Sequence, residues 1–488
     1  MFIGEVMKRA SKKLHPQKND YSEFHLTETK NSNQMKEVIK YVKENKKEYI
    51  EELKDYLRIP SISTLESYKG AVKKCSKFVA SKLKDAGMKS VKIYPTDGHP
   101  LVYAEWMKAP GKPTVLIYGH YDVQPVDPLN LWKSDPFEPV IKSRKIWARG
   151  ADDNKGQNFV HIKSVEAYLK IKGELPVNVK FLIEGEEEIG SPNLEKFLKK
   201  NKKLLKCDTV LISDTSMYAP GVPTINYGLR GLCYMEVELT GPNRDLHSGS
   251  FGGGIANPIN ELAKLISKLQ DKNGKIAIPD FYKDVKALTK KERENYKKLK
   301  FSDAELMKEY GVNELQGEKG YSTLERFSGR PSLDCNGIVG GFIGEGAKTV
   351  LPSKARAKIS MRLVPDQDPN KIAKLFEKYV KSIAPKSVKI KVTAHHGGLP
   401  IVMPLDDEAI KAAANAVSKA FGKETVYTRE GGSIPIVVEF SKQLKAPVVL
   451  MGLGLETDNI HSPNEHFPIK NFELGILSSI YFLDEYSK

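Results

Sequence analysis

Short apolar runs alternate with segments of helical periodicity along this chain, and this alternation constrains its fold more than any other feature of the sequence. Six of the apolar runs are Val91–Tyr94, Leu101–Glu105, Val115–Tyr118, Val179–Ile183, Thr209–Ile212 and Val448–Leu453. The helical segments between them include Asn158–Ile171 and Leu194–Lys200. Strands that alternate with helices are typical of layered proteins, so the sequence predicts an α/β fold with a mainly parallel sheet and helices on both of its faces.

The length of 488 residues predicts two domains, because a single domain usually has about 100–200 residues. Between roughly residues 229 and 398 the order of strand-like and helix-like segments changes. These segments are Cys233–Leu239, Pro258–Leu269, Lys354–Val364 and Asn370–Ala384, with a long helical insert rich in Lys and Glu at Lys283–Glu309. We therefore expect an N-terminal extension over residues 1–34, a larger domain made of residues 35–228 and 399–488, and an α+β domain inserted at residues 229–398.

The net charge of +16 makes nucleic-acid binding a hypothesis to test against the sequence. The basic residues are mainly lysines scattered among Glu and Asp, as in Lys283–Lys300, and the chain has no recognition helix, RNP-type aromatic string or zinc finger. No apolar run approaches the roughly 18–20 residues of a membrane-spanning helix. We therefore expect neither a nucleic-acid partner nor a membrane partner.

Four cysteines are spread along the chain, and no two of them form a C-x-x-C pair. They are Cys75, Cys207, Cys233 and Cys335. This spacing argues against a disulfide scaffold and against a structural zinc site made of thiolates. The N-terminus carries charges soon after Phe2 and Ile3, unlike a secretory signal, so we expect a cytoplasmic protein.

Acidic residues and histidines follow several of the apolar runs, either directly or after a loop. They are His120 and Asp122 after the third run, Glu186, Glu187 and Glu188 after the fourth, Asp214 after the fifth and His461 after the sixth. A further pair, Asp152-Asp153, comes just before a helical segment. Because ligands of open α/β sheets gather at the carboxyl ends of the strands, we expect these side chains to lie at one site.

So many carboxylates at one site would repel one another unless a cation neutralised them. Histidines and carboxylates without cysteine form a ligand set that suits Zn²⁺, Mn²⁺ or Co²⁺. The number of acids fits two metal ions about 3.5–4 Å apart with one bridging carboxylate. The residues themselves therefore predict a site for two divalent metal ions.

The motifs around these residues resemble those of the co-catalytic zinc metallopeptidases, a family that includes aminoacylase, acetylornithine deacetylase, succinyl-diaminopimelate desuccinylase and glutamate carboxypeptidase. The matching stretches begin at Tyr118, Ala148, Glu184, Tyr227, Asp245, Gly346, Arg362, Arg429 and His461. They follow the family's order over nearly the whole chain after about residue 35 and look closest to the cytosolic non-specific dipeptidase and carnosinase branch. The insert around Lys283–Glu309 is also similar to that branch. The resemblance implies a metallopeptidase catalytic domain and an inserted lid and dimerisation domain.

The resemblance also implies a role for each acidic residue and histidine at the strand ends. His120 and Asp214 would bind the first metal, Glu188 and His461 the second, and Asp153 would bridge them. Asp122 would orient His120, and Glu187 would be the general base. Asn154 stands where the dipeptidases usually have Asp, at a position that is not a ligand.

Other matching positions belong to substrate binding. His247 matches a histidine that reaches across a homodimer into the partner's active site and steadies the tetrahedral intermediate. Five positions match substrate contacts: Thr349, Arg362, His396, Glu430 and Ser433. An arginine is suitable there, because a guanidinium can bind a carboxylate with two hydrogen bonds.

The expected function is hydrolysis of the peptide bond of dipeptides or short peptides by a metal-activated water, with Glu187 as general base. The expected cofactors are two divalent ions, Zn²⁺ or Mn²⁺. One alternative is an N-acyl amino acid deacylase, an amidohydrolase on the same scaffold. A second alternative is a catalytically silent metal-binding scaffold.

Overall fold

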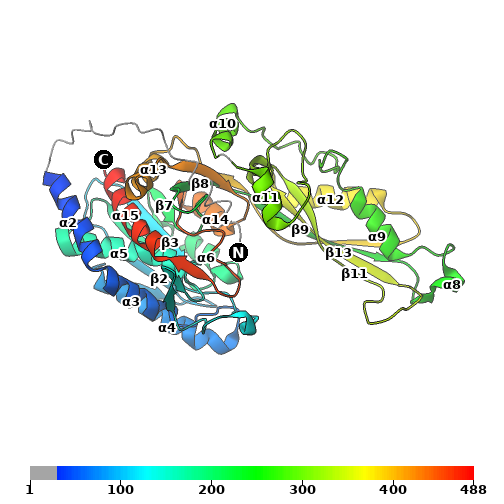
Figure 1. The fold of residues 1–488 in the computed structure, drawn as a ribbon, viewed down its shortest axis with the longest axis horizontal. Coiled ribbons are helices and arrows are strands. Elements are labelled where there is room, and N and C mark those ends of the chain that lie inside the picture. The colour runs from blue at the N-terminus through cyan, green and yellow to red at the C-terminus, as the bar shows by residue number, and fades with distance from the viewer. Residues whose placement is uncertain (1–29, 300) are drawn as a thin grey trace. The chain divides into compact units, whose positions relative to one another are not determined.

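The computed structural model describes residues 30–299 and 301–488, without the side chains of residues 30–34 and 396 (Figure 1). The chain divides into two compact units. The first unit contains the chain up to residue 227, residues 403–428 and residues 439–488, and the second contains residues 228–402 and 429–438. Most of the predicted N-terminal extension lies outside the described residues, and helix α2 begins at Lys30. None of the described helices is long and apolar enough to cross a membrane.

The largest sheet has parallel strands at its centre and antiparallel strands at its edges. Its order is β1-β2-β6-β3-β7-β17-β8-β15, with β16 paired to β8. The strands are β1 (Lys92–Tyr94), β2 (Leu101–Trp106), β3 (Thr114–His120), β6 (Asn178–Glu184), β7 (Thr209–Ile212), β8 (Thr224–Leu229), β15 (Ile401–Val402), β16 (Val426–Glu430) and β17 (Val448–Gly452). The pairs β6–β3, β3–β7 and β7–β17 are parallel. This arrangement confirms the predicted α/β fold.

Helices cover both faces of this sheet. The ring of Tyr118 on β3 packs edge-on against Phe440 of α14 (Pro435–Leu444), with ring centroids 4.9 Å apart. The next residue, Gly119, faces α5 (Lys155–Lys172), where a Cβ atom would lie only 2.8 Å from Cγ of Asn158. Successive residues of a strand point to opposite faces, so α5 and α14 lie on opposite sides. Burial on both faces explains why β3 and β6 contain consecutive apolar residues, Val115–Tyr118 and Phe181–Ile183.

The remaining helices of the first unit pack around this core, and a small sheet joins two of its loops. The helices are α2 (Lys30–Glu44), α3 (Lys46–Leu57), α4 (Lys69–Asp85), α6 (Leu194–Lys200), α7 (Lys202–Leu205), α13 (Glu408–Phe421) and α15 (Ile469–Tyr486). The small sheet has the order β18-β5-β4, with β18 at His466–Pro468, β5 at Lys145–Trp147 and β4 at Val140–Lys142. Antiparallel pairing of β5 with β18 places the segment after β5 beside the segment before β18.

The second unit is built on an antiparallel sheet with the order β11-β13-β9-β14. Its strands are β9 (Gly231–Thr240), β11 (Ser332–Gly340), β13 (Lys354–Leu363) and β14 (Lys389–Gly398), and its helices include α9 (Pro258–Ser267) and α12 (Pro369–Ile383). A separate pair of short strands joins β10 (Leu246–His247) to β12 (Val350–Leu351), and α8 (Ser248–Phe251) follows β10. Buried residues alternate with less buried ones along β9 and β13. The buried face packs against α9 and α12, for example through Val237, Leu262, Ile359 and Phe376. An antiparallel sheet with one buried face produces this alternation.

The predicted helical insert at Lys283–Glu309 is made of two short helices, α10 (Lys290–Lys298) and α11 (Asp303–Tyr310). Thr289 starts α10 with a capping box, in which its side chain and Glu292 bond each other's backbone N–H groups. The Ser302 hydroxyl accepts a hydrogen bond from the Glu305 N–H at 3.2 Å and caps a second helix start. Two separate N-caps favour two helices over one, although the charge pattern is continuous.

His161 in α5 generates a prediction about stability. Its ring is fully buried between the hydroxyls of Ser479 and Ser213, at 3.0 and 2.9 Å, and burial lowers its pKa from 6.5 to about 3. Below pH 6.5 the unfolded chain takes up a proton that the folded protein does not accept until near pH 3, so stability falls as the pH falls through this window. We expect His161→Gln to remove this component, which is about 1.4 kcal/mol per pH unit.

The measurement is the free energy of unfolding of both proteins in denaturant, from neutral to mildly acidic pH. Parallel pH profiles for wild type and His161→Gln would contradict a neutral buried imidazole.

Candidate metal centre

The carboxyl ends of three neighbouring parallel strands bring the predicted ligands together. His120 is the last residue of β3, the short helical turn Glu187–Ile189 follows β6, and Asp214 follows β7. In the sheet register His120 pairs with Glu184, so β3 and β6 end at the same level. Asp153 precedes the first turn of α5, and His461 lies in the loop between β17 and β18. The sheet therefore places residues that are far apart in sequence at one edge.

The Asp153 carboxylate joins two groups of possible ligands. Its Oδ1 lies 3.1 Å from Nε2 of His120, and its Oδ2 lies 2.9 Å from Nε2 of His461. Asp214 completes the first group and Glu188 the second, and within each group the ligand atoms lie within 4.8 Å of one another. A carboxylate with one oxygen in each group is the arrangement that a bridging ligand between two metal ions requires.

The His120 side chain is oriented so that one ring nitrogen can bind a metal. Its Nδ1 lies 3.1 Å from the backbone oxygen of Asp122, which only accepts, so Nδ1 carries the proton. Nε2 then faces Asp153 and Asp214, at 3.1 and 3.7 Å, and is the nitrogen that a metal ion would bind in place of a proton. A second partner that fixes the tautomer is usual for a metal-binding histidine.

Asp122 also holds the loop that carries the glutamates. Its two carboxylate oxygens accept hydrogen bonds from the backbone N–H groups of Glu187 and Glu188, at 3.2 and 3.1 Å. Asp122 is fully buried, and its carboxylate Oδ1 also lies 3.4 Å from Nδ1 of His120. One side chain therefore positions both the end of β3 and the turn after β6.

The three consecutive glutamates have different surroundings. Glu186 is 3% exposed and accepts hydrogen bonds from the backbone N–H of His99 and the amide of Asn193. Oε2 of Glu188 lies 3.2 Å from Nε2 of His461. The Glu187 carboxylate forms no hydrogen bond or ion pair with any side chain in the described ranges 30–299 and 301–488. Of the three, Glu188 belongs to a group of possible metal ligands, and the Glu187 carboxylate is not engaged by a described side chain.

Sequence reasoning assigned no role to two amides that contact the ligands. The Asn154 amide donates to Oδ1 of Asp214 at 2.8 Å, and its oxygen accepts from the His120 backbone N–H at 3.3 Å. The Gln124 amide donates to Oε2 of Glu188 at 2.8 Å. Both lie inside the motifs that carry the family resemblance, but a motif match alone does not indicate which ligand an amide contacts.

The electrostatics of the two histidines show how strongly this site attracts positive charge. Burial by itself lowers the pKa of His120, but its interactions with Asp122, Asp153 and Asp214 outweigh burial and raise that pKa well above its usual range. Interactions with Asp153 and Glu188 raise the pKa of His461 to about 10. Both imidazoles therefore hold protons where a metal ion would otherwise supply the positive charge.

The carboxylates respond in the opposite way. Burial raises the pKa of Glu188 to about 7, and burial with nearby negative charges raises the pKa values of Glu187 and Asp214. Such a site is unstable as a set of bare anions, and a bound divalent cation relieves the repulsion.

The residues present fit two divalent metal ions. Nε2 of His120 and Oε1 of Glu188 are buried and accept or donate no hydrogen bond within the described part of the chain. The donor set is two imidazoles and three carboxylates, which suits Zn²⁺ or Mn²⁺. Buried polar atoms without hydrogen-bond partners are costly, so their presence on two residues of the ligand groups supports a metal centre.

The other predicted site residues belong to the second unit. The Arg362 guanidinium donates to the Ser433 hydroxyl at 3.1 Å, and that hydroxyl donates to the backbone oxygen of Arg230. Thr349 is exposed, and its backbone oxygen accepts from Ser248, the residue after His247.

Two further predicted contacts and a cavity also belong to this unit. Glu430 ends β16, and His396 lies in β14 with its side chain outside the described residues.

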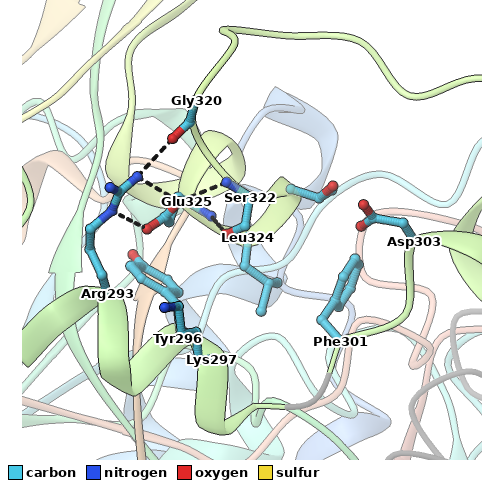
Figure 2. Close-up of a pocket in the computed structure, with 10 residues that line it drawn as sticks. Arg293, Tyr296, Lys297, Phe301, Asp303, Gly320, Ser322, Leu324 and Glu325 are labelled. Carbon is cyan, nitrogen blue, oxygen red and sulfur yellow. Dashed lines mark hydrogen bonds and ion pairs between the residues drawn. The ribbon is translucent and has the colours of Figure 1, made fainter.

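A cavity of about 550 Å³ is lined by residues of α10, α11 and the turn that follows them (Figure 2). Its Arg293 is paired with Glu325 at 2.7 Å, and none of the predicted site residues lines it.

Comparison with known proteins identifies the family. Residues 116–484 match the family described as Peptidase family M20/M25/M40. The chain belongs to this peptidase family. The Cys-Gly metallodipeptidase DUG1 of Candida albicans is 35% identical to it over 468 residues, which cover 92% of this chain and 96% of the relative. The predicted metallopeptidase family and its dipeptidase branch are thereby confirmed.

Solved structures agree with this M20 assignment. Human carnosine dipeptidase 1 has a TM-score of 0.79 and 32% identity, covering 93% of this chain and 98% of that structure. The M20 family metallo-carboxypeptidase Sso-CP2 from Sulfolobus solfataricus has a TM-score of 0.80 and 36% identity, covering 90% and 99%. The M20 chain therefore shares its fold and about a third of its aligned residues with a carnosine dipeptidase and a metallo-carboxypeptidase.

The shared carboxylate predicts how metal binding depends on single residues. Asp153→Ala should abolish binding of both ions, because this residue belongs to both ligand groups, whereas His461→Ala should abolish binding of one. Metal content per chain, measured by mass spectrometry after dialysis, tests this. Equal metal content in Asp153→Ala and His461→Ala would contradict a bridging role.

Proposed function

We propose that this protein hydrolyses the peptide bond of dipeptides with two divalent metal ions, Zn²⁺ or Mn²⁺. The observation that carries the proposal is the Asp153 carboxylate, which presents one oxygen to His120 and the other to His461. The relatives named as a Cys-Gly metallodipeptidase and a carnosine dipeptidase support the substrate class. Four free cysteines are consistent with the proposed cytoplasmic location.

Five residues would hold the ions: His120, Asp153 and Asp214 the first, and Asp153, Glu188 and His461 the second. When bound, the ions would polarise the scissile carbonyl and lower the pKa of a water molecule. Asp122 would keep His120 in the binding tautomer and hold the glutamate turn in place. The first unit would thus be the catalytic domain.

Glu187 would act as the general base and then as the general acid. Its backbone N–H is held by Asp122, while its carboxylate has no partner among the described side chains. A carboxylate that is fixed at its backbone but free at its oxygens can accept a proton from water and return it to the leaving amine.

Arg362 would bind the free carboxylate of the substrate. Its guanidinium lies beside Ser433. A second guanidinium, that of Arg230, is nearby: burial and then the positive charge of Arg362 lower the pKa of Arg230 to about 10. Two neighbouring guanidinium groups with a hydroxyl form a suitable binding place for a carboxylate. Thr349, His396 and Glu430 are proposed as further substrate contacts.

His247 would stabilise the oxyanion in the active site of a second copy of the chain. Its Nδ1 accepts hydrogen bonds from the backbone N–H groups of Gly249 and Ser250, at 3.1 and 3.3 Å, so the proton is on Nε2. The exposed Nε2–H can then donate to a developing negative charge.

The second unit would supply the dimer contact through β11. This strand is at the edge of its sheet, and Ile338, Val339 and Ile343 on it and after it are 55%, 58% and 89% exposed. An exposed apolar edge strand is a template for pairing with another chain. We propose that its occupant is the same edge of a second copy, which makes the second unit a lid and dimerisation domain.

Two other activities use the same metal centre. A deacylase would require an N-acyl group instead of a free amine, and a carboxypeptidase, as one similar structure is named, would remove the C-terminal residue of a peptide whose amine need not be free. A catalytically silent scaffold would bind metal without turnover.

Hydrolysis of a substrate panel by metal-stripped protein, with Zn²⁺ or Mn²⁺ added back, tests the function. We expect metal-dependent cleavage of free dipeptides and none of N-acetyl amino acids or N-blocked dipeptides.

Glu187→Gln should retain its metal and lose on the order of 10²–10⁴ in kcat, as for other general bases. The matched control Glu186→Gln should keep wild-type activity, because the Glu186 carboxylate is engaged by His99 and Asn193, which are not ligands.

Each other result selects a different function. Cleavage confined to N-acetyl amino acids would favour the deacylase, and cleavage of N-blocked dipeptides would favour the carboxypeptidase. An active Glu187→Gln variant would remove Glu187 from the mechanism.

Light scattering of the variant Ile338→Lys with Ile343→Lys tests the dimer. We expect this variant to have half the mass of wild type, to bind metal normally and to lose on the order of 10²–10³ in kcat, the range for an oxyanion donor. Ile141→Lys is the control, since Ile141 is an exposed isoleucine of the first unit and should leave the mass unchanged. A monomeric wild type, or a variant that stays dimeric, would refute the proposed interface.

A further inference from the structure

We propose that Glu465 is a positioning residue of the metal centre, which fixes the distance between the loop of Asp153 and the loop of His461. This inference rests on the proposed metal centre and concerns a residue that binds neither ion. Glu465 is fully buried and ends the loop that carries His461, just before β18.

The Glu465 carboxylate accepts four hydrogen bonds, all from the segment that carries Asp153. Its Oε1 accepts from the backbone N–H groups of Asp152 and Asp153, at 2.9 and 3.1 Å. Its Oε2 accepts from the N–H of Gly150 at 2.9 Å and from the Arg149 guanidinium at 2.8 Å. The N–H of the bridging ligand itself is therefore held by the loop of the second histidine.

Arg149 extends this contact to a third segment. Its other terminal nitrogen donates to the backbone oxygen of Pro125 at 2.9 Å, and its guanidinium lies 5.3 Å from the ring of Trp132. Pro125 follows His120 and Asp122 along the chain. The buried pair of Glu465 and Arg149 thus connects three of the segments around the two ligand groups: those of His461, Asp153 and His120.

The loop of His461 depends on such anchors because its backbone is locally unfavourable. Asn459, His461 and Asn464 have φ values of 59°, 59° and 65°. Asparagine tolerates this left-handed region, but for histidine it is less favourable than the right-handed region. The loop therefore keeps its shape through contacts at its ends, where Glu465 supplies the largest number of hydrogen bonds.

The two ion sites should depend on Glu465 to different degrees. The first site has His120 at the end of β3 and Asp214 just after β7, both supported by the sheet. The second site has His461, whose loop is held by Glu465. In Glu465→Gln an NH₂ group would replace one carboxylate oxygen, which accepts from two N–H donors in the wild type. Because an NH₂ group cannot accept these hydrogen bonds, we expect the loop of His461 to move away from the loop of Asp153.

Calorimetric titration of metal-stripped protein with Zn²⁺ tests the proposal, with the absorption spectrum of added Co²⁺ as a probe of ligand geometry. We expect two binding steps in wild type, and in Glu465→Gln a second step weakened by at least about tenfold, as for other residues that orient metal ligands. The first step should change much less, and the Co²⁺ spectrum of the second ion should change. Arg149→Lys should weaken the same step, because an ammonium group cannot reproduce both guanidinium contacts.

Glu325→Gln is the matched control, because Glu325 is also a buried carboxylate with several hydrogen bonds, but its partners Arg293 and Ser322 belong to the second unit and to no ligand loop. The control should titrate as wild type. Unchanged binding in Glu465→Gln would overturn the proposal. Equal weakening of both steps, accompanied by a lower unfolding temperature of the stripped protein, would also overturn it, since Glu465 would then act only on folding. The titration measures metal binding and not hydrolysis. If wild type bound two ions but cleaved no peptide in the substrate panel, the proposed function would be refuted and this inference would stand.

Discussion

The carboxylate of Asp153 is shared between two histidines, and the first unit is organised around this contact. One oxygen faces His120 at the end of β3, and the other faces His461 in a loop more than three hundred residues later. Such a contact concentrates negative charge, which is costly to bury without a compensating cation. A pair of divalent ions accounts for the shared carboxylate, the surrounding acids and the buried nitrogen of His120 together.

The precision of the site comes from buried side chains that bind backbone groups of other loops. Asp122 holds the N–H groups of Glu187 and Glu188, and Glu465 holds those of Gly150, Asp152 and Asp153. Loops at strand ends have no regular hydrogen-bond ladder of their own, so such contacts replace it. Charged acceptors are suited to this purpose because they form stronger hydrogen bonds than neutral ones.

The sequence predicted the site residues that directly follow a buried strand, because a buried strand is recognisable from the apolar residues of a single segment. The runs before His120, Glu184 and Asp214 are apolar because their strands are buried on both faces, which makes the strand ends visible. The helical character of Lys283–Glu309 was predictable, but its division into two helices was not, because the two N-caps, Thr289 and Ser302, are short local signals inside a continuous charge pattern. The importance of Glu465 was not predictable, since its donors lie 312 to 316 residues away in the chain.

The sequence by itself determined the α/β fold, the family and the strand ends that carry histidines and acids, because periodicity and motif order are properties of single segments. Only the tertiary structure decided which oxygen of Asp153 faces which histidine, which ring nitrogen of His120 carries its proton, and that Glu186 is engaged while Glu187 is free. The physical reason is that a hydrogen bond depends on position and direction within a few tenths of an ångström. Those positions are set by the packing of distant segments, which no local pattern records.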